Sequence, residues 1–110
     1  MNYSVKTIGI FEKQAKKLNK KYPSLKSELL DLVQNLKVDP QHGGIPLGNS
    51  CYKIRLAIKS KGKGKSSGAR VITHIVVLNQ TVYLLSIYDK SGKENLSDKE
   101  LKLLLESVPD

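Results

Sequence analysis

The sequence predicts an α+β domain that combines a small, mostly antiparallel sheet with an N-terminal helical hairpin and a C-terminal helix, in the order β-α-α-β-β-β-α. Three observations lead to this prediction. Apolar residues recur at helical spacing near the N-terminus, three strand-like runs follow in the second half, and Ser97 with Glu100 forms a capping box before the last helix. The length of 110 residues indicates one domain, residues 1–110.

The helical hairpin follows a short first strand, Ser4–Ile8. One face of the first helix is apolar and its other sides are rich in lysine. That face consists of Phe11, Ala15, Leu18 and Tyr22. Pro23 ends the first helix, and Ser24 is expected to cap the second one. The second helix should end before Asp39-Pro40, because a residue that precedes proline avoids the helical region.

The second half of the chain predicts three strands after a glycine-rich loop, Gln41–Ser50. The strands are expected at Cys51–Ile58, Ala69–Leu78 and Thr81–Tyr88, and the last two form a hairpin. Between the first two strands, Lys59–Gly68 reads KSKGKGKSSG. This segment has too little apolar content to pack, so we expect a flexible, cationic hairpin tip.

The charge of the chain points to an anionic partner. Lysine and arginine total 19 against 10 acidic residues, which gives a net charge of +9. Such a surplus attracts nucleic acid or an acidic protein, although solubility alone is an alternative explanation. The sequence has no apolar run of membrane-spanning length, no secretory signal and a single cysteine, so we expect a cytoplasmic protein without a membrane partner.

The residue types argue against a metal site. His42 and His74 have no ligand at the usual helical spacing, and Cys51 is the only cysteine. We expect His74 to be a hydrogen-bonded strand histidine and Cys51 to pack at a strand start. A Cys51–His74 nucleophilic pair stays open as an alternative.

A set of cationic residues is the main candidate for chemistry. Lys53 and Arg55 share one strand face, Arg70 opens the next strand, and Lys90 follows the last strand beside Tyr88. If the three strands are neighbours, these side chains converge. Lysine, arginine and tyrosine together can cleave an RNA phosphodiester, because arginine grips phosphate and a lysine crowded by cations can act as a base. The alternative is a solvated strand face that binds an acidic partner or nothing.

Three segments resemble the RelE/ParE toxin superfamily: CYKIRL (51–56), GARVI (68–72) and VYLLSIYDK (82–90). The pattern SKGKGKSSGARVI, followed by YLLSIYDKSGKENLS, is most similar to the HigB-like branch of that superfamily. The resemblance covers nearly the whole chain, and the expected element order matches the RelE-like fold.

The resemblance implies the toxin of a type II toxin–antitoxin system, with a cognate antitoxin as its protein partner. Many members bind the ribosome and cleave the mRNA there. Their cleavage needs no metal and no cofactor, because the 2′-hydroxyl is the nucleophile and the products are a cyclic phosphate and a 5′-hydroxyl. The sequence leaves two alternatives open: a ParE-like inhibitor of DNA gyrase without nuclease activity, and a non-catalytic basic nucleic-acid-binding protein.

The resemblance also implies residue roles. Lys53 and Arg55 match a basic pair that handles protons and stabilises charge, and Arg70 matches an arginine that grips the scissile phosphate. Lys90 stands where RelE-like members often have an arginine that contacts the leaving group or a phosphate, and Tyr88 would stack on a base or move a proton. The final helix lacks the tyrosine that many RelE-like enzymes carry there, which leaves the identity of the general base open.

Two further expectations concern binding and stability. The lysines of the hairpin tip should contact ribosomal RNA electrostatically. They are Lys59, Lys61, Lys63 and Lys65. Arg70, as a strand-end residue that faces a site, is expected to carry little packing, so its replacement by alanine should leave the fold intact.

Overall fold

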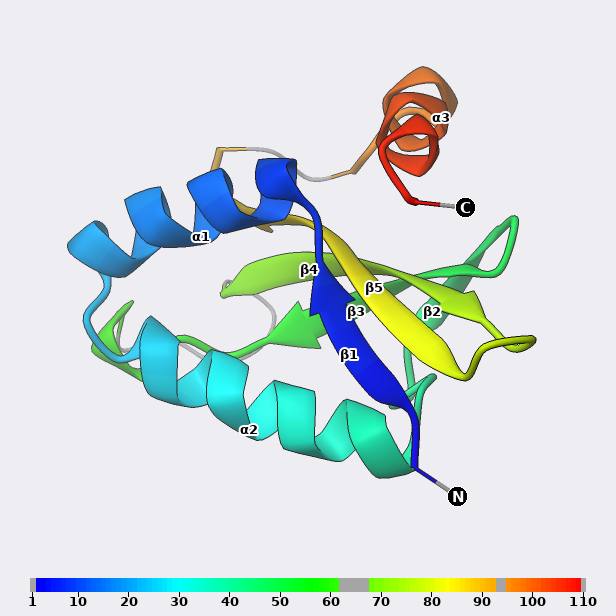
Figure 1. Cartoon of the computed structure of the whole chain (residues 1–110). Helices are drawn as coiled ribbons and strands as arrows, with labels where there is room; N and C mark the ends of the chain where they lie inside the picture. Colours follow the sequence, from blue (N-terminus) through cyan, green and yellow to red (C-terminus); the bar gives the residue numbers. More distant parts are fainter. Residues whose placement is uncertain (1, 62–67, 93–94, 110) are drawn as a thin grey trace.

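The computed structural model describes residues 2–61, 68–92 and 95–109 (Figure 1). The strands are β1 (Ser4–Thr7), β2 (Ile45–Gly48), β3 (Cys51–Leu56), β4 (Ala69–Val76) and β5 (Thr81–Asp89). The helices are α1 (Gly9–Lys21), α2 (Leu25–Val38) and α3 (Asp98–Glu106), with a short 3-10 turn η1 at Lys59–Lys61.

The strands form one mixed sheet in the order β1-β5-β4-β3-β2. The β2–β3, β3–β4 and β4–β5 pairs are antiparallel, and only the first strand, β1, pairs in parallel, with β5. The predicted α+β class and the mostly antiparallel sheet are therefore confirmed, as are the three main strands to within two residues at their ends.

The strand β2 corrects the prediction of a loop at residues 41–50. Ile45 pairs with Lys53 and Pro46 with Tyr52, before a bulge at Gly48, whose φ of +88° suits glycine. Pro46 has no N–H to donate to a neighbouring strand, so a strand that contains it is tolerated only at the edge of a sheet. Its four residues, IPLG, carry no alternating pattern, so only the pairing with β3 reveals the strand.

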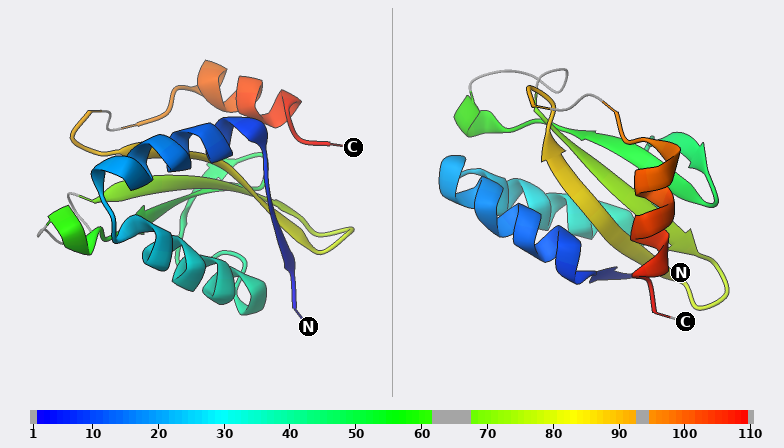
Figure 2. Two further views of the ribbon diagram at one scale, coloured as in Figure 1. Left: turned by 60° about the vertical axis from the view of Figure 1, so that its left-hand side comes forward. Right: turned by 90° about the horizontal axis from the view of Figure 1, so that it is seen from above.

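The three helices take different places around the sheet. Figure 2 shows α3 over one face, α2 against the opposite face, and α1 alongside β5. The core between α2 and the sheet contains fully buried Leu25 and Leu36 of α2, Val71 of β4 and Val82 of β5. Burial of these apolar side chains is the main favourable contribution to the stability of the fold.

Two of the helix boundaries predicted from the sequence are confirmed, and one predicted helix cap is absent. The second helix ends at Val38, before Asp39-Pro40, and the capping box of Ser97 with Glu100 is present at the start of α3. Ser24, however, makes no capping hydrogen bond to the backbone of α2. Its hydroxyl instead donates to Glu28 Oε1 at 3.1 Å and lies 2.8 Å from the hydroxyl of Ser60.

The start of the lysine-rich segment is more ordered than its composition predicts. The strand β3 ends at Leu56, Ile58 is fully buried, and the turn η1 follows. The buried carboxylate of Glu28 accepts a hydrogen bond from the backbone N–H of Lys59 at 2.6 Å, which attaches the turn to α2. The prediction that the whole segment stays unpacked is therefore wrong for these residues, because a buried acid anchors them. Lys63 and Lys65 lie outside the described residues.

In the described part of the chain, no helix combines the length and the apolar character that crossing a membrane requires.

Candidate active site

Three of the predicted site residues form a single row across the sheet. Arg55 of β3 is the register partner of Arg70 of β4, and Arg70 is the partner of Tyr88 of β5. Directly opposed residues on neighbouring strands point to the same face, with Cβ atoms about 4.5–5.5 Å apart. Two arginines and a tyrosine therefore project from neighbouring positions on one face, close to the ends of the three strands.

Lys53 belongs to the neighbouring row on the same face. It is the register partner of Ile72, which pairs with Ser86. Its ammonium group donates a 2.8 Å hydrogen bond to Asn95 Oδ1, in the segment that leads into α3. Lys53 thus lies two residues from Arg55 on the same face, and its hydrogen bond to Asn95 ties it to the chain that crosses this face.

Lys90 lies just beyond the end of β5. Its backbone N–H donates to the carbonyl of Gly68 at 3.1 Å, which continues the β4–β5 ladder by one residue. Gly68 fits tightly here, because a Cβ atom would meet the carbonyl oxygen of Leu56 at 2.1 Å. The backbone of Lys90 is therefore fixed next to the Arg55–Arg70–Tyr88 row.

Arg70 is buried, which corrects the expectation that it carries little packing. Its side chain is only 3% exposed, whereas that of Arg55 is exposed. Its Nη1 donates to the carbonyl oxygen of Ala69 at 3.1 Å. The sequence places Arg70 at a strand start, but β3 and β5 flank it on both sides, so its removal would leave a cavity beneath the site.

A carboxylate network holds the same end of the sheet together. Asp89 Oδ1 accepts hydrogen bonds from Lys61 Nζ at 2.7 Å and from the backbone N–H and hydroxyl of Ser91, while Oδ2 accepts from the Tyr22 hydroxyl at 2.8 Å. Burial raises the pKa of Asp89, but the bonds from Lys61, Ser91 and Tyr22 outweigh this effect and hold the pKa well below its usual range.

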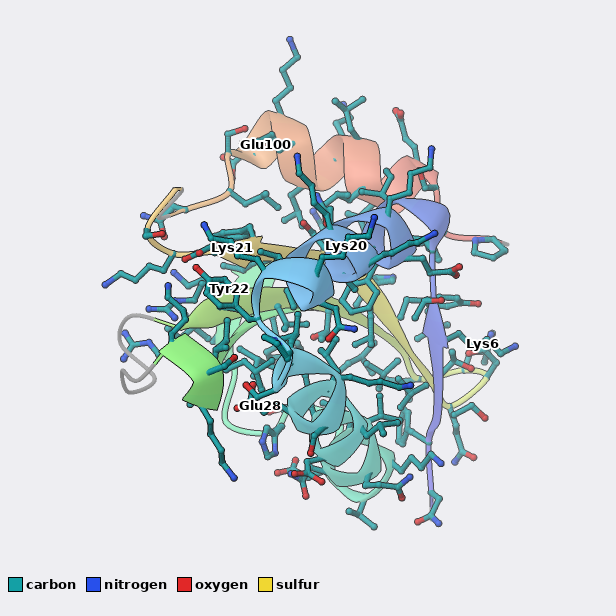
Figure 3. All side chains as sticks on the ribbon, turned by 90° about the vertical axis from the view of Figure 1, so that its left-hand side faces the viewer. Lys6, Lys20, Lys21, Tyr22, Glu28 and Glu100 are labelled. Atoms are coloured by element: carbon teal, nitrogen blue, oxygen red, sulfur yellow. The ribbon has the colours of Figure 1, made fainter. Side chains whose placement is uncertain are left out.

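Cations also surround the ring of Tyr22. The ammonium groups of Lys21 and Lys61 each lie 5.4 Å from its centroid, a cation–π distance. Figure 3 shows Lys21 and Tyr22 together beside the turn η1, with Glu28 below them. The network thus joins α1, η1 and β5, and Lys61 is one of its members, with a side chain only 10% exposed.

The sequence alone assigns no role at this site to His42 or Asp89. A cavity of about 320 Å³ is lined by His42, Ile45, Lys53 and Arg55, so a histidine borders the same space as the two cations. No periodic pattern marks His42, because it stands in the irregular segment before β2. Asp89 lies inside the YDK motif, where an acid among cations was the available signal.

The histidine and cysteine predictions are confirmed for His74 and Cys51. The Cys51 sulfur lies 3.5 Å from His74 Nδ1, within hydrogen-bonding distance for sulfur. Cys51 is 1% exposed, and burial raises the pKa of its thiol to about 11. The thiol therefore stays protonated, so the pair has no nucleophilic thiolate at neutral pH. Across residues 2–61, 68–92 and 95–109, no group of three or more His, Cys, Asp or Glu side chains is arranged to hold a metal.

The chain is similar to known proteins in sequence and in fold. Residues 8–108 match the model of the RelE toxin of the RelE/RelB toxin–antitoxin system. The E. coli RelE toxin with two arginine-to-alanine substitutions, solved in the free state, is 21% identical; the likeness covers 86% of this chain and 90% of that one, with a TM-score of 0.63.

Two complexes show the same fold. The toxin–antitoxin complex RelBE from Mycobacterium tuberculosis gives 18% identity and a TM-score of 0.60 over 81% of this chain and 99% of the other. The intact E. coli RelBE complex gives 20% identity and a TM-score of 0.51 over 79% and 95%. Since the family match spans nearly all of the chain, this protein belongs to the RelE toxin family of toxin–antitoxin systems.

Proposed function

We propose that this toxin is an endoribonuclease that cleaves mRNA on the ribosome by metal-independent attack of the RNA 2′-hydroxyl. The observation that carries the proposal is the Arg55–Arg70–Tyr88 row, with Lys53 and Lys90 beside it. These groups can donate protons and neutralise charge, and those are the two needs of the reaction.

The proposed reaction forms a bond between the 2′-oxygen and phosphorus and breaks the bond between phosphorus and the 5′-oxygen. The 2′-hydroxyl loses its proton to a base, and the departing 5′-oxygen gains a proton. The products are a 2′,3′-cyclic phosphate and a 5′-hydroxyl, so water does not take part in this step and no cofactor is needed.

The exposed Arg55 is suited to the first contact with the scissile phosphate, because its planar fork can donate two hydrogen bonds. Arg70 would stabilise the negative charge that develops on the phosphorane. Since Arg70 is only 3% exposed, neighbouring side chains must move aside before it reaches the phosphate.

The proton transfers are assigned to Lys53, Tyr88 and Lys90. Lys53 lies on the same face as Arg55, two residues away along β3, where its amine is placed to exchange a proton with the RNA. Tyr88 and Lys90 stand at the end of β5, where either group would protonate the departing 5′-oxygen. His42, which lines a cavity with Lys53 and Arg55, is a further candidate for the base.

The lysine-rich segment is proposed to contact ribosomal RNA through Lys59, Lys61, Lys63 and Lys65. Lys59 is exposed and is suited to this role. Lys61 is committed to the ion pair with Asp89, so its main contribution would be to fix the base of the segment.

A cognate antitoxin is the proposed protein partner. Two of the matching structures, from E. coli and M. tuberculosis, are toxin–antitoxin complexes. With a net charge of +9, this toxin would favour an acidic or amphipathic antitoxin segment that covers the basic face. Within the family, the SKGKGKSSGARVI pattern supports placement in the HigB-like branch, and the ribosomal target implies that the protein acts in the cytoplasm.

The test is primer extension on a reporter mRNA in a translating system with and without the toxin, and on naked RNA in EDTA. The expected result is cleavage that depends on translating ribosomes and persists when free metal is chelated. Growth arrest without any cleavage in either setting would contradict the proposal and would favour gyrase or another protein target.

A further inference from the structure

A small cavity of about 230 Å³ lies beside the Arg55–Arg70–Tyr88 row, between the sheet and α3. Its walls are Gln14 of α1, Ser86 and Tyr88 of β5, and Leu96, Glu100 and Leu104 from the α3 side. Figure 3 shows Glu100 at the start of α3, above the sheet. Tyr88 belongs both to the row and to the cavity, so the two sites are adjacent.

The side chain of Gln14 is held in one orientation. Its Oε1 accepts a hydrogen bond from the Ser86 hydroxyl at 2.9 Å and one from the backbone N–H of Ile87 at 3.0 Å. The strand β1 pairs with β5 only as far as Leu84, and Gln14 supplies the acceptor that a longer β1 would have supplied. Because a backbone N–H can only donate, the amide oxygen must face β5.

This orientation decides which polar groups the cavity presents. The amide nitrogen of Gln14 keeps its two donor hydrogens, and no residue in the described part of the chain accepts from it. The hydroxyl hydrogen of Ser86 is used on Gln14, so Ser86 offers lone pairs only. The cavity thus combines the Gln14 donor, the Ser86 acceptor, the Glu100 carboxylate, leucine side chains and a tyrosine ring.

Such a combination suits a flat heterocycle with a polar edge. Unstacked RNA bases bind between apolar or aromatic side chains and are read by hydrogen bonds to their edges. The volume of about 230 Å³ is below the range of about 300–1,000 Å³ that is usual for whole small-molecule ligands. A single base fits this description better than a complete nucleotide.

We propose that this cavity binds one unstacked mRNA base next to the scissile phosphate, and that Gln14 selects a base with a keto group. The proposal rests on the proposed function and adds a specificity determinant to it. A keto oxygen of guanine or uracil accepts from the Gln14 amide, whereas the amino group of adenine or cytosine would meet a second donor. Gln14 determines specificity and takes no part in bond cleavage.

The substitution Gln14→Glu tests the proposal without removing the contact that the fold uses. A glutamate has the same shape and still accepts from Ser86 and Ile87, but it presents an acceptor to the cavity in place of a donor. The matched control is Gln34→Glu, the same change at an exposed position of α2.

The first measurement maps cleavage by primer extension on reporter mRNAs randomised around the cut, in a translating system. The wild type and Gln34→Glu should favour guanine or uracil at one flanking position. Gln14→Glu should shift this preference toward adenine or cytosine by about tenfold, the size of one base-edge contact. A wild-type profile that persists in Gln14→Glu would overturn the proposal.

The second measurement does not depend on cleavage. Short RNAs with a 2′-deoxy sugar at the scissile position, differing in one base, are titrated into the purified toxin and followed by fluorescence anisotropy. If the wild type cleaves no mRNA but binds keto bases more tightly, and Gln14→Glu reverses this order, the cleavage proposal fails and the base site stands. Affinity that is independent of the base in the wild type refutes the site, whatever the cleavage result.

Discussion

Adjacent rows of the same three strands perform different tasks. Ile54, Val71 and Ile87 are register partners across β3, β4 and β5, and each is at most 3% exposed. The next row along consists of Arg55, Arg70 and Tyr88 on the opposite face. Since side chains alternate between the faces of a sheet, one residue step separates the hydrophobic core from the candidate active site.

The apolar core holds the candidate active site in register. A slip of one residue in β3, for example, would turn Ile54 out of the core and Arg55 into it, so the packing of the apolar row fixes where the cations lie. Arg70 is an exception to the division between a buried apolar row and an accessible cationic row, because it is charged but buried. Substitutions in and near the two rows should show whether stability and cleavage depend on different residues.

The largest effect is expected from Arg70→Lys, which keeps the positive charge but loses the planar fork of donors. Ribosome-dependent cleavage should fall about 10²–10³-fold, the usual cost of losing one positioned charge-stabilising group. Quantitative primer extension on variants with verified far-UV circular dichroism measures this loss. Cleavage within a factor of two of wild type would remove Arg70 from the proposed site.

A second effect is expected from Asp89→Asn, which weakens the network that joins α1, η1 and β5. Loss of the carboxylate that Lys61 contacts should lower the free energy of unfolding at pH 7 by about 1–3 kcal/mol. Urea denaturation of both proteins measures the difference.

The pH dependence of that difference has a definite sign. The folded-state pKa of Asp89 lies below the unfolded value of about 3.9, so the carboxylate stabilises the fold fully above that value, and the stabilisation is lost as pH falls through the folded-state pKa. The gap between wild type and Asp89→Asn should therefore shrink below about pH 4. A gap that stays constant down to pH 2 would contradict the assignment to Asp89.

A smaller effect is expected from Ile87→Val in the apolar row. Loss of one buried methylene group should lower the free energy of unfolding by about 0.5–1.5 kcal/mol. Cleavage per folded molecule should not change, because Ile87 points away from the row of cations. A drop in cleavage beyond the loss of folded protein would show that the two faces are coupled.

The smallest effect is expected from replacing Lys59, Lys63 and Lys65 together by glutamine, which changes no residue of either row. Lys61 is left in place because its removal would also break the ion pair with Asp89. Ribosome binding, measured by co-sedimentation over a salt series, should weaken and depend less steeply on salt. Identical salt slopes for the variant and the wild type would argue against RNA contacts by this segment.

The sequence predicted most of the fold because periodicity and turn residues mark most of its elements. The hairpin of α1 and α2, the strands β3 to β5 and the capped helix α3 each have such a mark. The strand β2 has none, since Pro46 and Gly48 interrupt it and only its pairing with β3 creates it. For the same reason the irregular segment hid His42, which borders the site.

The sequence predicted which residues form the candidate site, but it did not predict how deeply each of them is buried. The strand order aligns Arg55, Arg70 and Tyr88 as expected, but the burial of Arg70 depends on what covers it, which no local pattern encodes. The role of Gln14 was equally hidden, because an amide in a lysine-rich helix gives no signal until the edge of β5 lies beside it.

The parallel pairing of β1 with β5 has a consequence for the moment at which the toxin becomes active during synthesis. Ser4 pairs with Thr81, so the first strand to leave the ribosome must wait for one of the last segments before the sheet can close. The row of Arg55, Arg70 and Tyr88 is likewise incomplete until β5 has emerged. If the protein cleaves mRNA as proposed, a nascent chain cannot cut the message that encodes it until β5 has been translated and has left the ribosome.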